Sequence, residues 1–160
     1  MEIHHKALCA DIIKYNNEKE VIQLTIKNDI VSLWDNGTDK LCLFAVPADN
    51  QYKYISGKPC ITVGVAYESE GYKGCDVFTL FDHFFYDTLD AMKNTYRDLN
   101  GSFRLYDNGA NSDGFVDFKM KNGKLHVVGR LGASFTSHSL TFEFDADQTL
   151  LEPFVQSLTV

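Results

Sequence analysis

The chain has 160 residues and a pI near 5.1, with 44% hydrophobic residues, 23% charged residues and a formal net charge of −7. These values exclude wholesale disorder and fit a single domain, residues 1–160, with a core of its own. The acidic balance argues against a nucleic-acid binder, which carries a basic face, and against docking on an anionic membrane.

No apolar run in the sequence is long enough to cross a membrane as a helix. Residues 1–6 lack the basic stretch and the apolar core of a signal peptide. We therefore expect a cytoplasmic protein. Its cysteines form no Cys-x-x-Cys pair and are expected as reduced thiols in or near the core: Cys9, Cys42, Cys60 and Cys75.

The first half of the chain has the pattern of β-strands. Residues 21–27 alternate apolar and polar side chains, which is typical of a half-buried strand. Residues 41–46 form a continuous apolar run, as in a strand buried on both faces or at the edge of the core, and residues 61–67 are rich in β-branched side chains. Residues 35–38 contain Asn-Gly, which favours a turn because it tolerates positive φ. The remaining elements of this half are a turn at 71–74 and a strand at 76–80.

A helix is predicted from residue 82 to residue 99. Its apolar side chains recur at spacings of four and three and form one stripe: Phe85, Leu89, Met92, Tyr96 and Leu99. Asp82 is the expected N-cap, because its carboxylate can accept from unpaired backbone N–H groups. Gly101 is the expected left-handed residue after the helix.

An antiparallel meander is predicted after this helix. Alternating apolar side chains define strands at 102–107, 115–121, 124–131 and 140–145. Asn122-Gly123 is expected to join the middle two strands in a tight hairpin. Thr149 and Glu152 have capping-box spacing at the start of a short final helix. The predicted fold class is α+β: an antiparallel, two-layer β-sheet with one long helix after residue 82 and a short C-terminal helix.

Motifs of common enzyme sites are absent from the sequence. It has no Gly-x-Gly-x-x-Gly or Gly-x-x-x-x-Gly-Lys phosphate loop and no Gly-x-Ser-x-Gly elbow. The five histidines lack metal-ligand spacing. Residues 107–114, DNGANSDG, superficially resemble a calcium loop but lack the glycine and the final glutamate that such a loop needs. We therefore expect no cofactor, no metal site and no enzymatic activity.

Acidic side chains in the second half are the remaining feature that could meet a partner. If the predicted strands are neighbours, several carboxylates collect on one exposed face or edge of a sheet. The residues predicted to bind a partner are Asp107, Asp113, Asp117, Glu143 and Asp145. Such a surface favours association with a basic protein. The alternative is a solvated face that only aids solubility.

Three stretches of the second half carry a recognisable pattern: residues 89–101 (LDAMKNTYRDLNG), 123–129 (GKLHVVG) and 140–150 (LTFEFDADQTL). They resemble the WapI-type immunity proteins of bacterial contact-dependent toxin systems. In that family a helix ending in Leu-x-Gly leads to a hairpin, then to an alternating strand and an Asp-Gln-Thr motif before the last helix. The resemblance implies a small cytoplasmic protein that binds and neutralises one cognate toxin domain, such as a basic nuclease.

Two other classes stay open. A small-molecule-binding or enzymatic α+β domain would use His83 and Asp87, which lie four residues apart on the predicted helix. That class needs a concave pocket into which both side chains point. A structural subunit would instead self-associate through an exposed strand edge. The sequence leaves the toxin's identity and the oligomeric state undetermined.

Overall fold

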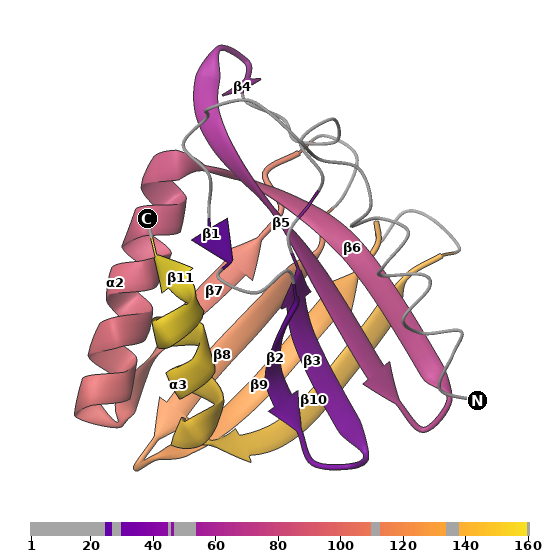
Figure 1. Ribbon diagram of the computed structural model, residues 1–160, viewed down its shortest axis with the longest axis vertical. Helices are drawn as coiled ribbons and strands as arrows, with labels where there is room; N and C mark the ends of the chain where they lie inside the picture. The colour runs from indigo at the N-terminus through magenta and orange to yellow at the C-terminus, as the bar shows by residue number, and fades with distance from the viewer. Residues whose placement is uncertain are drawn as a thin grey trace.

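The computed structural model describes residues 25–26, 30–44, 46, 54–109, 113–133 and 138–159. These residues build two antiparallel β-sheets, one long helix and a short C-terminal helix, so the predicted α+β class is confirmed. In Figure 1 one sheet lies in front of the other and their strands cross. We call them the front sheet and the rear sheet.

The front sheet comes from the chain before the long helix. Its strands are β2 (Ile30–Asp35), β3 (Asp39–Phe44), β5 (Lys58–Ser69) and β6 (Tyr72–Phe81), each paired with the next, and the short β4 (Tyr54–Ile55) on the start of β5. The strand predicted at 41–46 is present as β3, which ends at Phe44, lies between β2 and β5, and has residues 41–44 all buried, as expected for a strand buried on both faces. Gly37 has φ 85°, in the turn predicted between β2 and β3.

The rear sheet follows the long helix as the predicted meander. Its strands are β7 (Asn100–Tyr106), β8 (Phe115–Lys121), β9 (Lys124–Leu131) and β10 (Leu140–Asp147), each antiparallel to the next. Asn122 and Gly123 have φ of 52° and 75° and form the predicted tight turn between β8 and β9.

The helices lie together at one side of the two sheets (Figure 1). They are α2 (Asp82–Asp98), the 3₁₀ helix η2 (Gln148–Leu150) and α3 (Leu151–Ser157). A two-residue pairing joins β1 (Thr25–Ile26) to β11 (Leu158–Thr159). The strand predicted at 21–27 falls within the described residues only at β1, and Cys9 lies outside them.

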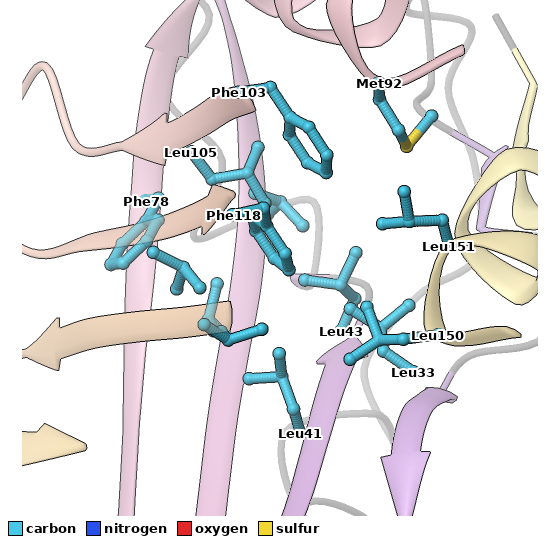
Figure 2. Close-up of a cluster of buried hydrophobic side chains, with 14 of the residues drawn as sticks. Leu33, Leu41, Leu43, Phe78, Met92, Phe103, Leu105, Phe118, Leu150 and Leu151 are labelled. Carbon is cyan, nitrogen blue, oxygen red and sulfur yellow. The ribbon is translucent and has the colours of Figure 1, made fainter. Parts of the chain in front are cut away.

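A hydrophobic cluster fills the space between the sheets and reaches both helices. Phe78 of the front sheet and Phe118 of the rear sheet are fully buried in it, and α2 contributes Met92 (Figure 2). Leu150 enters from η2 and Leu151 from α3. The two sheets therefore share one core, to which each strand contributes its alternate side chains.

The edge of β6 is closed by the segment that follows β7. Asn108 donates its backbone N–H to the carbonyl of Thr79 at 2.8 Å, and its side-chain oxygen accepts from the N–H of Phe81 at 3.0 Å. Asp107 Oδ1 accepts from the N–H of Thr79 at 2.8 Å. The loop thus pairs with an otherwise open strand edge and ties the two sheets together at this corner.

The predicted helix ends need correction. Asp82 is the first helical residue rather than the N-cap, which is Phe81, although the Asp82 carboxylate does accept from the backbone N–H of His83 at 2.7 Å. The left-handed residue at the other end is Leu99, with φ 52°, whereas Gly101 lies inside β7. At the start of η2 the cap is Asp147, which accepts from the N–H of Thr149, so Thr149 is not the cap.

Two predictions for the front sheet also need correction. The turn expected at 71–74 spans Glu70 and Gly71, since β5 ends at Ser69 and β6 begins at Tyr72. Cys75 is exposed and is therefore not a core residue, whereas Cys42 is buried and Cys60 is half-buried. Burial raises the pKa of the Cys60 thiol, and the nearby Asp82 carboxylate adds to that rise.

Candidate functional site

The outward-pointing side chains of the rear sheet form a regular array, which we call the outer face. The strand register sets four rows that cross β7, β8, β9 and β10 in turn. The rows are Tyr106–Phe115–Arg130–Thr141, Arg104–Asp117–Val128–Glu143, Ser102–Lys119–His126–Asp145 and Asn100–Lys121–Lys124–Asp147.

No described helix covers the outer face. Both α2 and α3 send their buried side chains into the shared core, and the front sheet lies on the same inner side (Figure 1). The side chains of the outer face are accordingly exposed or half-buried, in contrast to the fully buried ones that alternate with them along each strand. In the part of the chain that the structure describes, the whole of this sheet face is therefore open to a partner.

At one end of the outer face, Phe115 lies between two arginines. The ring centroid is 4.8 Å from Arg104 Cζ and 5.2 Å from Arg130 Cζ, close enough for cation–π attraction on both sides. We call these three residues the Arg–Phe–Arg cluster. They come from three neighbouring strands, so the register of the sheet builds the cluster.

Carboxylates hold both arginines of this cluster in place. Asp117 accepts from the Nε and Nη2 of Arg104 in a two-point pair, which raises the pKa of that guanidinium. Asp113 accepts from Arg130 Nη2 at 2.7 Å through its side chain and at 3.0 Å through its carbonyl. The Nε of Arg130 is buried and has no acceptor among the described residues. The two carboxylates thus hold the cluster in a fixed arrangement.

Beside the cluster, His126 sits between two carboxylates of β10. Its Nδ1 is 2.9 Å from Asp145 Oδ1 and its Nε2 is 3.3 Å from Glu143 Oε1. The side chains of Glu143 and Asp145 are nevertheless 68% and 88% exposed, so they remain available to a partner. Together with Asp147 they form an acidic column along β10, which we call the acidic edge.

The five carboxylates predicted to bind a partner do not form one acidic cluster. Asp117, Glu143 and Asp145 do share the outer face, and Asp113 borders it. Asp107 lies apart, because its carboxylate accepts from the backbone N–H groups of Thr79 and Gly109 at the corner between the sheets.

Charge on the outer face is also balanced rather than acidic. Five basic side chains stand against four acidic ones, a formal charge of +1 with His126 neutral. The predicted partner-binding set did not include the basic residues that pair with these carboxylates, namely Arg104, His126 and Arg130. The alternation along each strand places them on the outward side, so the pattern of the predicted strands contained this signal.

The helix pair His83 and Asp87 does not come together. His83 Nδ1 faces Asp82 Oδ1 at 3.7 Å, and its ring lies against Phe84 with a centroid distance of 4.1 Å. Both His83 and Asp87 are exposed. The structure has a cavity of about 310 Å³ between β6 and the start of β10, and neither residue lines it. The structure therefore gives the enzymatic alternative no site built on this pair.

Comparison of the chain with protein-family models, with curated proteins and with solved structures finds no match. Within the described residues, no helix has the length and apolarity needed to span a membrane.

Proposed function

We propose that this protein is an immunity protein that binds and neutralises a cognate bacterial toxin domain in the cytoplasm, and that the toxin docks on the outer face of the rear sheet. One observation carries the proposal: the Arg–Phe–Arg cluster stands on a sheet face that no described helix covers. The resemblance of the second half to WapI-type immunity proteins supports the same function.

Aromatic and arginine side chains are enriched among the few groups that dominate protein–protein binding. Here the ion pairs with Asp113 and Asp117 already fix both guanidinium groups. Fewer side-chain rotamers are then lost when a partner binds, which favours affinity. Burial of Phe115 beneath the partner would remove its half-exposed ring from water.

The acidic edge gives this surface a preferred partner charge on one side. Glu143 and Asp145 project from the edge strand. Their side chains are more exposed than those of Asp113 and Asp117. A toxin with basic groups opposite β10 would be steered toward this edge and held in one orientation.

The test reads the coding region immediately upstream and co-expresses this protein with the variable C-terminal domain of the large secreted toxin that the proposal expects there. Wild-type protein should restore growth of the toxin-producing cells and co-purify with the toxin domain. Phe115→Ser should weaken both effects. Tyr72→Ser is the matched control, because Tyr72 is 71% exposed and lies at the tip of the front sheet, away from the outer face. Equal loss for both variants would contradict docking on the outer face, and absence of rescue by wild type would contradict the immunity function.

Charge reversal tests the acidic edge separately. The double variant Glu143→Lys/Asp145→Lys should weaken protection while leaving the fold intact, as judged by circular dichroism and urea unfolding. The control Asp87→Lys/Asp90→Lys makes the same change in net charge on the exposed side of α2. Protection that survives reversal at the acidic edge would remove this edge from the docking surface.

A further inference from the structure

The turn between β8 and β9 carries three exposed lysines that lie together on the outer face. Lys121 and Lys124 are direct cross-strand partners, and Lys119 stands two residues before Lys121 on the same face. None of the three makes an ion pair within the described part of the chain. We call these three residues the lysine corner.

Like charges directly opposite each other on neighbouring strands destabilise a sheet. The carboxylates on the neighbouring strand β10 form no ion pair with these lysines. Asp147 is opposite Lys124 in the register, but its Oδ1 accepts from the N–H and the hydroxyl of Thr149. Asp145 contacts His126. A chain with a net charge of −7 thus keeps three lysines side by side on an open face, two of them directly opposite each other, and such an unfavourable local arrangement is expected at functional positions.

We infer that the lysine corner receives a carboxylate-rich surface of the protein that docks on the outer face. The inference rests on the proposed function and names the chemistry of one part of the toxin's docking surface. Clustered Asp and Glu side chains of the toxin lie over the β8–β9 turn, and its basic groups lie over the acidic edge. The two zones together fix the orientation of the bound toxin.

Charge on the neighbouring strand argues for a protein rather than a nucleic acid. Asp145 and Asp147 lie on β10, next to Lys124 on β9 and two strands from Lys119 and Lys121 on β8, where they repel a continuous phosphate backbone. A protein surface can alternate its charges over that distance.

The first arm of the test measures association with the toxin domain that wild-type protein neutralises. Lys119→Gln/Lys121→Gln/Lys124→Gln should slow association about tenfold at low salt, and the difference should shrink as salt rises. The control Lys40→Gln/Lys73→Gln/Lys93→Gln removes three lysines elsewhere and should associate faster than the corner variant. Equal rates for the two variants would overturn the inference.

The second arm needs no toxin and so separates this inference from the proposed function. A poly-L-glutamate peptide and an oligothymidylate of equal charge are titrated into ¹⁵N-labelled protein at low salt. Poly-L-glutamate should shift the amide signals of Lys119, Lys121 and Lys124, and oligothymidylate should shift them less. No shift with poly-L-glutamate, or stronger binding of oligothymidylate, would overturn the inference. Shifts that appear on concentrating the protein alone would assign the corner to a second copy and overturn it equally.

Discussion

The two faces of the rear sheet are built from the same four strands and differ in almost every physical respect. The inner face carries apolar side chains that the front sheet and the helices bury, such as Phe118 and Val127, both 0% exposed. The outer face carries charged pairs, one aromatic cluster and the lysine corner. The inner face specifies the fold, whereas the fold places few constraints on the outer face.

Energies explain why the two faces are under different constraints. Burying one large apolar side chain stabilises a fold by about 1.5–3 kcal/mol. An exposed ion pair such as Arg104–Asp117 contributes about 0–1 kcal/mol, because water screens it and both side chains lose freedom. Outer-face residues can therefore vary to suit a partner at little cost in stability, and inner-face residues cannot.

Truncating one phenylalanine on each face of β8 should give the largest difference in stability between the two faces. Phe118→Ala should lower the free energy of unfolding by about 3–5 kcal/mol, since it leaves a cavity beside Phe103, whose ring stacks at 4.5 Å. Phe115→Ser should cost less than about 1.5 kcal/mol because its ring is only half-buried. Urea unfolding followed by circular dichroism measures both.

Toxin neutralisation should depend more on Phe115 than on Phe118, the opposite of the order expected for folding stability. Phe115→Ser is expected to weaken toxin neutralisation while the protein stays folded. A conservative inner-face variant, Phe118→Leu, should retain neutralisation at temperatures where it is folded. Large destabilisation by Phe115→Ser would mean that the outer face also carries the fold.

A smaller effect is expected at Tyr67, a residue of the front sheet whose side chain belongs to the shared core. Its ring stacks on Phe142 at 4.1 Å, and its hydroxyl donates to Asp39 Oδ1 at 2.5 Å. That hydrogen bond holds the pKa of Asp39 below its ordinary value of 3.8, and burial raises the pKa of Tyr67. Tyr67→Phe should lower the free energy of unfolding by about 1–2 kcal/mol at neutral pH.

The sign of the pH dependence follows from the lowered pKa of Asp39. Stabilisation from an ionised carboxylate is complete above the ordinary value of 3.8 and is lost as pH falls through the lower value of the folded state. The deficit of Tyr67→Phe relative to wild type should therefore shrink in urea unfolding below about pH 4. A deficit that is constant between pH 3 and pH 7 would contradict a role for the Asp39 hydrogen bond.

Sequence patterns predicted the strands and helices better than the site. Alternation along residues 115–121 and 124–131 was enough to predict two strands and the Asn122-Gly123 turn, because burial and turn geometry are local signals. The pairing of Asp117 with Arg104 depends on a register between two strands that the sequence does not state. Asp107 was expected on a binding surface for the same reason: its acceptor role depends on β6, which is distant in sequence.

A still smaller effect concerns Leu99, which ends α2 in the left-handed conformation with φ 52° and is 38% exposed. A non-glycine residue is strained there, whereas glycine is not. Leu99→Gly should raise the free energy of unfolding by about 0.5–1 kcal/mol and leave the outer face unchanged. Thermal unfolding measures the shift, and Leu99→Ala, which keeps the strain, is the control. No gain for glycine over alanine would contradict the backbone strain at this position, whereas a loss for both variants relative to wild type would show that apolar contacts of Leu99 outweigh the strain.

The smallest expected effect concerns the lysine corner, within the outer face itself. Lys124→Glu replaces the repulsive pair with Lys121 by an attractive one, so the unbound protein should gain about 0.2–1 kcal/mol in the free energy of unfolding. Lys93→Glu on α2 makes the same change in net charge with no lysine opposite it on a strand, so it should give no such gain. If the lysine corner receives carboxylates, Lys124→Glu must at the same time weaken binding of the toxin. A variant that both stabilises the free protein and impairs its complex would identify Lys124 as a residue kept for its partner and not for the fold.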